Sequence, residues 1–258
     1  MIPKKIHFCW FGGNPLSDKA IMCIESWKKF MPDYEICRWD ENNFDPNAYG
    51  DYVAQAYAAK KYAFVADYFR FWVLHEHGGI YFDSDVEVVK SFDDLLEHDI
   101  FTGYEDRGTF EPAVLGAVAG HRVFAEMLEY FKSTRFINED GSMNIVPLPI
   151  PFTAKMREMY SIKELNFKKT IVLPDGAIYP KAYFSPQDMF TFKVKVTPNT
   201  YCIHRFTNSW RSPEELKKLA KVRKLSKFMG RRLAHSLVFN GFGGTVKKIF
   251  KYPFRKRG

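Results

Sequence analysis

The sequence predicts an α/β domain, in which strands alternate with helices, followed by a basic helical tail. The first forty residues already contain a strand, a helix and a second strand, a spacing typical of a parallel βαβ unit. With 258 residues, of which 46% are hydrophobic and 17% aromatic, the chain can bury a large core. Residues 211–258 carry fifteen Lys or Arg against two Glu, a net charge of +13, which predicts a separate basic tail.

Periodicity and chain breakers place the elements of the first half. Short β-branched and aromatic runs that end at Gly or Pro indicate strands, and apolar residues three or four apart indicate helices. We expect strands at 5–11, 34–39, 80–82 and 86–89, and helices at 17–30 and within 52–77. Residues 62–77 are apolar on nearly all sides, so this helix should be buried, and Gly78-Gly79 should end it.

The second half follows the same rules. We expect strands at 100–104, 113–119, 170–173, 177–179 and 201–204, helices at 120–131 and 152–160, and a loop at 138–151. Ser212-Pro213-Glu214-Glu215 has the pattern of a helix start, with Ser as the N-cap and Pro at the first helical position. This last helix is expected to continue towards Val238, and Gly241 to Gly244 to form a hinge after it.

The body that precedes the tail is mildly acidic. Because the whole chain carries +8, the first 210 residues carry a net charge of −5. The four cysteines form no CxxC pair, so a structural zinc site is not expected. The amino-terminal residues do not resemble a signal peptide, and no apolar stretch is long enough to span a membrane. We therefore expect a cytoplasmic protein with reduced cysteines.

Asp83-Ser84-Asp85 carries the strongest chemical signal in the sequence. If the strand that begins at Ile80 continues through it, both aspartates point to the same side at the strand's carboxyl end, where open α/β sheets bind ligands. Two carboxylates there suit Mg²⁺ or Mn²⁺, which complete their coordination with substrate phosphates. The alternative interpretation is a solvated acidic turn.

Asp67 and Arg70 are a charged pair within an apolar helix. They stand three residues apart and share a helix face, and burying them is costly unless both have partners. One interpretation is a structural ion pair that holds the helix to the sheet. The other is that the pair faces the same cleft as Asp83, where Asp67 bonds sugar hydroxyls and Arg70 holds donor or phosphate oxygens.

Several segments together resemble a known family. Ala66-Asp67-Tyr68-Phe69-Arg70, followed by Gly78-Gly79-Ile80-Tyr81-Phe82-Asp83-Ser84-Asp85, resembles the signature of the DXD sugar-transferase family. That family includes glycosyltransferase family 32 and the catalytic domains of the large clostridial glucosylating toxins. Residues 6–13 are similar to the family's first strand and loop, and His204 with Asn208-Ser209-Trp210 matches its carboxyl-terminal active-site segment. The resemblance covers about residues 5 to 210.

The resemblance implies a GT-A-type fold, a Rossmann-like mixed sheet flanked by helices, over residues 1–211. It also implies a role for each matched residue. Trp10 stacks on the nucleobase, usually uracil, and Asp67 and Arg70 contact the donor sugar. Asp83 reaches the ribose or the sugar and, through water, the metal, while Asp85 is the direct ligand of Mn²⁺ or Mg²⁺. Ser209 and Trp210, joined by Asn208, close over the β-phosphate, and His204 is a further candidate metal ligand.

These roles describe a metal-dependent, retaining glycosyltransferase. It would move a hexose from a UDP-sugar to a saccharide or lipid-linked saccharide acceptor, in the synthesis of bacterial capsule, O-antigen or lipopolysaccharide. Residues 212–258 alternate Lys and Arg with Leu and Phe, which suits an anionic membrane surface, so we expect a peripheral location on the inner face of the cell membrane. A docking helix with a solvated basic face is the alternative. No nucleic-acid motif accompanies the tail, so no nucleic acid is expected as partner.

Two other functions fit parts of the sequence. Asp83 and Asp85 after a hydrophobic strand also resemble the nucleophile strand of haloacid-dehalogenase-type phosphatases, although Glu87 stands where those have Thr or Val. The second alternative is a non-catalytic sugar-nucleotide-binding module of an envelope assembly complex. Other polar residues are weaker candidates: Glu105 and Asp106, Asn144, and 147–153 for the acceptor site, and His75-Glu76-His77 for a metal.

Overall fold

The computed structural model describes all residues except 107, 190, 208–212, 231–232, 235 and 239–258. The described residues form two compact units. The first unit comprises Met1–Gln187 and Val194–Phe206. The second comprises Asp188–Lys193 and the described residues that follow Phe206. The candidate site residues with described positions all belong to the first unit.

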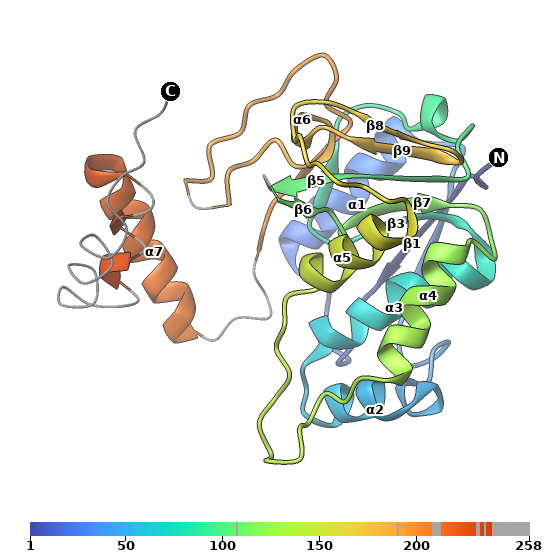
Figure 1. Ribbon diagram of the computed structural model, residues 1–258, viewed down its shortest axis with the longest axis horizontal. Helices are drawn as coiled ribbons and strands as arrows, with labels where there is room; N and C mark the ends of the chain where they lie inside the picture. Colours follow the sequence, from blue (N-terminus) through green and yellow to red (C-terminus); the bar gives the residue numbers. More distant parts are fainter. Residues whose placement is uncertain (107, 190, 208–212, 231–232, 235, 239–258) are drawn as a thin grey trace. The chain divides into compact units, whose positions relative to one another are not determined.

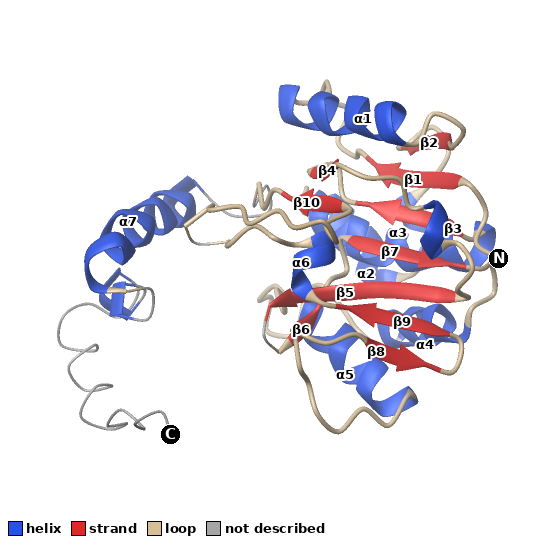
Figure 2. Ribbon diagram, turned by 90° about the horizontal axis from the view of Figure 1, so that it is seen from above, coloured by secondary structure: helices blue, strands red, loops and turns tan. Residues whose placement is uncertain are grey.

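A mixed sheet runs through the first unit, with the strand order β2-β1-β3-β7-β5-β9-β8 and β6 paired to β5 (Figure 2). The strands β1, β2 and β3 are parallel, β7 runs antiparallel to β3 and to β5, β9 is parallel to β5, and β8 is antiparallel to β9. Their bounds are β1 Lys5–Cys9, β2 Glu35–Trp39, β3 Gly79–Phe82, β5 Ile100–Asp106, β6 Thr109–Phe110, β7 Val114–Ala117, β8 Ile171–Leu173 and β9 Gly176–Tyr179. A small antiparallel sheet pairs β4 (Val86–Val88) with β10 (Cys202–His204).

Helices cover both faces of the main sheet (Figure 1). The first core layer holds side chains of α2 (Asp51–Ala58), α3 (Tyr62–His77), α4 (Arg122–Lys132) and α5 (Pro149–Met159). The second holds side chains of α1 (Asp18–Phe30), of α6 (Lys181–Phe184) and of the small sheet. Side chains alternate along β1 and β3, so Ile6 and Ile80 enter the second layer while Cys9 and Tyr81 enter the first. Two short 3-10 helices, η1 (Pro46–Tyr49) and η2 (Asp93–Leu95), complete the unit.

Two glycines lead the chain from α3 into β3. Gly78 has φ +63° and Gly79 has φ +105°, backbone angles that residues with a side chain rarely adopt. A Cβ atom on Gly79 would also lie 2.8 Å from the carbonyl oxygen of Lys5. This close approach lets β3 pair directly with β1, and it fixes where the strand delivers the aspartates that follow Phe82.

Most of the expected elements are present in the first unit. The parallel βαβ start is confirmed by the register Lys5↔Glu35 to Cys9↔Trp39. The expected helical region 52–77 consists of two helices, which are separated at Lys60 with φ +57°. Within the expected loop 138–151, helix α5 begins earlier than predicted, because Pro149 fits the first turn of a helix.

The second unit contains α7 (Pro213–Met229). The expected helix does not run unbroken towards Val238, because α7 ends at Met229 and Gly230 adopts φ +76°; helical residues follow again at 233–234 and 236–238. The expected N-cap Ser212 and the expected hinge at Gly241 to Gly244 lie outside the described residues. Within this unit the Arg223 guanidinium lies 3.6 Å from the centre of the Phe192 ring. None of the helices that the structure describes in either unit combines the length and apolar character needed to cross a bilayer.

Candidate active site

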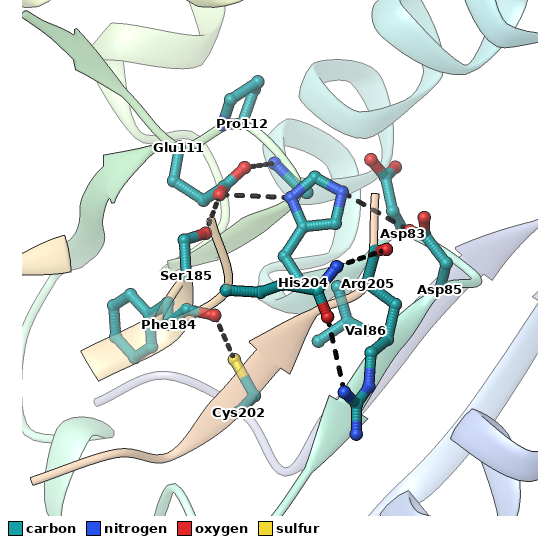
Figure 3. Close-up of polar contacts among 12 residues, drawn as sticks. Asp83, Asp85, Val86, Glu111, Pro112, Phe184, Ser185, Cys202, His204 and Arg205 are labelled. Carbon is teal, nitrogen blue, oxygen red and sulfur yellow. Dashed lines mark hydrogen bonds and ion pairs between the residues drawn. The ribbon is translucent and has the colours of Figure 1, made fainter. Parts of the chain in front are cut away.

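The two aspartates of the triplet lie in a turn between β3 and β4. The strand ends at Phe82, and the Asp83 carbonyl oxygen accepts a hydrogen bond from the Val86 amide at 3.0 Å. The expectation that a continuous strand carries both aspartates on one side is therefore wrong. The turn nevertheless brings their carboxylates together, and each offers an oxygen within 4.8 Å of the other and of a His204 nitrogen (Figure 3).

The pairing of β10 with β4 delivers His204 to this turn. His204 pairs in register with Val86, and the next residue, Arg205, donates its amide hydrogen to the Asp85 carbonyl oxygen at 3.0 Å. As a result the His204 Nε2 atom lies 3.5 Å from Asp85 Oδ1. The Phe206 ring covers the imidazole, with 4.0 Å between ring centres. His204 is thus buried between a carboxylate and an aromatic ring.

A buried carboxylate that no local sequence pattern indicates lies on the other side of the imidazole. Glu111 has a fully buried side chain, and its Oε2 atom lies 3.2 Å from His204 Nδ1. The same oxygen accepts the Ser185 hydroxyl, and Oε1 accepts the Ala113 amide at 3.1 Å. Burial raises the pKa of Glu111, but the charge of His204 and these hydrogen bonds outweigh it and hold that pKa below its usual range.

The pKa of His204 responds to the same contacts. Burial lowers it, but the carboxylates of Glu111 and Asp85 outweigh burial and raise the pKa well above the usual value. The two carboxylates therefore favour the positively charged form of the imidazole. A third acid, the partly buried Glu105, belongs to the same neighbourhood, since its carboxylate offers an oxygen within 4.8 Å of Glu111 and His204 ligand atoms.

Arg70 contacts the two other carboxylates of the site, those of Asp67 and Asp83. Its Nη2 atom donates to Asp67 Oδ1 at 2.8 Å, and its Nη1 atom lies 3.2 Å from Asp83 Oδ1. The guanidinium also donates to the Pro112 carbonyl at 2.8 Å and to the Ala66 carbonyl at 3.1 Å. The predicted convergence of Asp67, Arg70 and Asp83 is therefore present. Because Arg70 is only 4% exposed, its donors serve protein acceptors.

Both aspartates of this cluster keep part of their carboxylates exposed. The side chain of Asp67 is 17% exposed and that of Asp83 is 27% exposed. Tyr81, which is buried, donates its hydroxyl to Asp83 Oδ1 at 2.7 Å. Burial raises the pKa of Asp67 to about 6, against the opposing effect of the Arg70 charge. The two carboxylates are held in place by Arg70 and Tyr81 and present their remaining oxygens to the site.

The donor set around the turn fits a divalent cation. Asp83, Asp85 and His204 offer two carboxylate oxygens and one imidazole nitrogen within 4.8 Å of one another. Carboxylates suit Mg²⁺ and Mn²⁺, and an imidazole ligand favours the softer of the two, Mn²⁺. Glu111 hydrogen-bonds the nitrogen on the far side of His204, as carboxylates commonly do at metal-bound histidines.

The remaining predicted residues lie in different places. Trp10 follows β1, whose carboxyl end faces the same way as that of the parallel strand β3, and its indole N–H donates to the Asn14 carbonyl at 2.8 Å. Asn208, Ser209 and Trp210 lie outside the described residues. The histidines of His75-Glu76-His77 are near the end of α3, at the opposite end of β3 from the triplet.

Comparison with known proteins agrees with this geometry. Residues 17–102, which include α3 and the triplet, match the family model described as the glycosyltransferase sugar-binding region containing DXD motif. Together with the relatives that follow, this match shows that the chain is a glycosyltransferase. It is similar to the uncharacterized glycosyltransferase L373 of Acanthamoeba polyphaga mimivirus, with 25% identity over 222 residues, which is 81% of this chain and 84% of that one.

Two further relatives place this glycosyltransferase among known proteins. It is 29% identical over 123 residues to inositol phosphoceramide mannosyltransferase 3 of Schizosaccharomyces pombe, a match covering 46% of this chain and 34% of the yeast protein. Among solved structures, it is similar to PaToxG glycosyltransferase, with a TM-score of 0.52, 25% identity, and coverage of 62% of this chain and 70% of that one. The GT-A fold expected from the sequence is confirmed. These matches favour a transferase over the phosphatase and the non-catalytic module.

Proposed function

We propose that this glycosyltransferase moves a hexose from a UDP-sugar to a saccharide or lipid-linked saccharide acceptor, with Mn²⁺ or Mg²⁺ and with retention of the anomeric configuration. The observation that supports it most is the convergence of Asp83, Asp85 and His204 beside the Asp67–Arg70 pair. A cation bound by these three residues would lie next to carboxylates that can bond sugar hydroxyls, an arrangement that suits transfer from a nucleoside diphosphate sugar.

In this proposal Asp85 and His204 would hold the cation, with Asp83 as the third candidate ligand. When bound, the cation supplies positive charge that stabilises the diphosphate leaving group. Asp67 accepts hydrogen bonds from hydroxyls of the donor sugar through the exposed part of its carboxylate. The negative charge of this carboxylate stabilises an oxocarbenium-like transition state. Trp10 stacks on uracil, while Asn208, Ser209 and Trp210 close over the β-phosphate.

Arg70 takes a different part from the one the sequence suggested. Since its guanidinium is buried and donates to Asp67, Asp83 and two backbone carbonyls, we assign it the positioning of the two carboxylates. It contributes positive charge to the site from behind them. A direct bond from Arg70 to donor phosphates would require it to leave these acceptors, at the cost of unpaired buried groups.

A lipid-linked acceptor is supported by two observations. The yeast relative is named for a sphingolipid acceptor, inositol phosphoceramide. The basic residues of 212–258 provide the charge for an anionic membrane surface, where such acceptors are found. In a bacterial cell this would place the enzyme on the cytoplasmic side of the membrane, in capsule, O-antigen or lipopolysaccharide synthesis. Glu105, at the carboxyl end of β5 and beside His204, is our candidate for the acceptor side of the site.

A donor screen tests the proposed reaction. Purified protein is incubated with Mn²⁺ and a panel of UDP-sugars, with GDP-sugars as the alternative nucleotide class, and release of the nucleoside diphosphate is followed. We expect release from one UDP-hexose, and we expect EDTA to abolish it. Release from GDP-sugars alone would contradict the assignment of uridine, and metal-independent release would contradict the cation.

Replacement of Asp85 tests the cation site itself. Asp85→Ala is expected to abolish sugar transfer and Mn²⁺-dependent UDP binding in calorimetry, while circular dichroism stays that of the wild type. Glu97→Ala, at an exposed acid outside the site, serves as the control and should keep full activity. A fully active Asp85→Ala protein would refute the role given to Asp85.

A further inference from the structure

We propose that Glu111 is a positioning residue, which fixes the tautomer and the orientation of His204 so that Nε2 can bind the cation. The inference rests on the proposed function, because it requires the cation beside Asp85. Glu111 lies in the connection between β6 and β7, outside the DXD turn and outside residues 17–102.

The contacts of Glu111 are those of a fixed carboxylate. Its side chain is fully buried, which is costly for a charged group unless every oxygen has a partner. Oε1 accepts the Ala113 amide, and Oε2 accepts the Ser185 hydroxyl and faces His204 Nδ1 (Figure 3). The carboxylate therefore cannot easily move away from the imidazole.

This placement selects one form of the imidazole. A carboxylate only accepts hydrogen bonds, so Glu111 requires the proton of a singly protonated His204 to stand on Nδ1. The lone pair is then on Nε2, which is the nitrogen that faces Asp85. The negative charge of Glu111 also raises the basicity of the imidazole as a ligand.

The substitution Glu111→Gln would reverse this selection. The Ala113 amide is a fixed donor, so the oxygen of the introduced carboxamide would stay on that side, and its NH₂ group would face His204 Nδ1. An NH₂ group there favours the tautomer with Nδ1 as acceptor and the proton on Nε2, which cannot bind a cation. The substitution replaces one oxygen by nitrogen and leaves the volume of the side chain nearly the same.

The experiment is a titration with Mn²⁺, followed by calorimetry, of the full chain and its Glu111→Gln variant. We expect the variant to bind Mn²⁺ about 10- to 100-fold more weakly, the range found when such outer carboxylates are changed. Thr102→Val is the matched control, because it removes buried hydrogen bonds to the Glu111 and Val114 carbonyls and spares the carboxylate. It should lose stability and keep the Mn²⁺ affinity of the wild type.

A double-mutant cycle shows whether Glu111 acts through His204. In a His204→Ala background, Glu111→Gln should weaken Mn²⁺ binding by less than about two-fold, since the group that Glu111 positions is gone. An equally large loss in both backgrounds would overturn the inference, and so would wild-type affinity in a folded Glu111→Gln protein. If wild-type protein binds no Mn²⁺, the proposed cation site fails as well, whereas failure of the Glu111 variants alone leaves that site intact.

A measurement on unsubstituted Glu111 keeps the inference testable if Glu111→Gln does not fold. In ¹⁵N spectra of the Cd²⁺-loaded protein, His204 should carry its proton on Nδ1 and be metal-bound through Nε2. The signals are assigned by their loss in His204→Gln. A proton on Nε2, or a cation on Nδ1, would overturn the role of Glu111.

Discussion

At the scale of single residues, buried charges organise this site. Arg70 and Glu111 are 4% and 0% exposed, and each would be strongly destabilising if its partners were missing. Arg70 directs its donors to Asp67 and Asp83, and Glu111 directs its oxygens to His204, Ser185 and a backbone amide. Asp83 and His204, two of the candidate ligands, are thus each held from behind by a buried group of opposite charge.

The geometry of the Arg70 guanidinium should matter beyond its charge. Lys has a single ammonium group in place of the planar fork, so Arg70→Lys cannot hold Asp67, Asp83 and the Pro112 carbonyl together. We expect a loss of about 2–3 kcal/mol in the free energy of unfolding and a loss of at least about 100-fold in sugar transfer. Urea unfolding and nucleotide release measure the two effects. Arg38→Lys, at an exposed arginine, should change neither by much, and near-wild-type transfer by Arg70→Lys would refute the positioning role.

His7 makes the stability of the protein depend on pH. Its Nε2–H donates to the Gly78 carbonyl at 3.0 Å, and its Nδ1 accepts the Trp39 indole N–H at 3.1 Å. Burial, helped by nearby His77, lowers the pKa of His7 from 6.5 to about 4. Below pH 6.5 the unfolded chain therefore takes up a proton that the folded chain does not, so stability falls as the pH drops from 6.5 to 4.

The size of this effect follows from the shift in pKa. It corresponds to about 3 kcal/mol lost by about pH 4, in addition to what the carboxylates contribute. A glutamine side chain keeps a donor and an acceptor but does not titrate, so His7→Gln should lower stability near neutral pH and flatten its pH dependence. Urea unfolding of both proteins from about pH 4 to about pH 8 tests this. If the free energy of unfolding depends on pH in the same way for the wild type and for His7→Gln, His7 does not titrate as described.

At the scale of elements, the two-stranded sheet of β4 and β10 assembles the cation site. Each strand has only three residues, so the sheet needs support from side chains. Arg205, next to His204, donates from both Nε and Nη2 to Glu87 Oε2, with the Nε bond at 2.7 Å, and its Nη1 reaches Gln187 at 3.3 Å. This ion pair joins the strand that follows Asp85 to the strand that ends at His204.

Loss of the Glu87–Arg205 pair should therefore weaken cation binding as well as stability. We expect Glu87→Gln to lower the free energy of unfolding by about 1–2 kcal/mol and Mn²⁺ affinity by several-fold, because the two ligand-bearing strands are less firmly joined. Thermal unfolding and Mn²⁺ titration measure these changes. Glu35→Gln breaks a more exposed pair with Lys5 and should cost less than about 1 kcal/mol with unchanged Mn²⁺ affinity. Unchanged Mn²⁺ binding by Glu87→Gln would show that the pair is only structural.

Element identity was largely predictable from the sequence, whereas the packing of the site was not. Strands and helices follow from local periodicity, so most were placed correctly within a few residues. Asp67, Arg70 and the triplet stood out because charges are conspicuous in apolar runs. Glu111 did not stand out, because a Glu followed by Pro is also common in a solvent-exposed loop. Its pairing with His204, 93 residues away, depends on how β10 docks, which no local pattern contains.

The 3-10 helices and α6 were missed for a related reason. They have three or four residues each, too few to show a helical period. The sequence predicts a strand through Asp83-Ser84-Asp85 because strongly apolar residues flank the triplet on both sides, whereas the structure has a turn there. A hydrogen bond from the Val86 amide to the Asp83 carbonyl makes the turn, and the sequence contains no sign of that bond.

At the scale of the whole molecule, charge is divided between the two parts of the chain. Residues 211–258 carry +13 and the preceding residues −5. In the second unit, Lys217 and Lys221 of α7 are exposed, and so is Phe228, which is 87% exposed. Basic side chains together with an exposed aromatic ring are typical of helices that lie on anionic membranes. The proposed domain division, a catalytic part at 1–211 and a membrane-binding tail at 212–258, follows from this pattern.

Removal of residues 212–258 should release the protein from anionic membranes. Each Lys or Arg near such a surface contributes about 1 kcal/mol, so a tail with so many basic residues should dominate binding. We expect the full chain to sediment with phosphatidylglycerol vesicles but not with phosphatidylcholine vesicles, and to dissociate as salt screens the charges. The shortened chain should stay in the supernatant in all cases. Phe228→Ser keeps the charge and should weaken binding partially, because only apolar contact is lost. Equal sedimentation of full and shortened chains would show that the tail docks elsewhere.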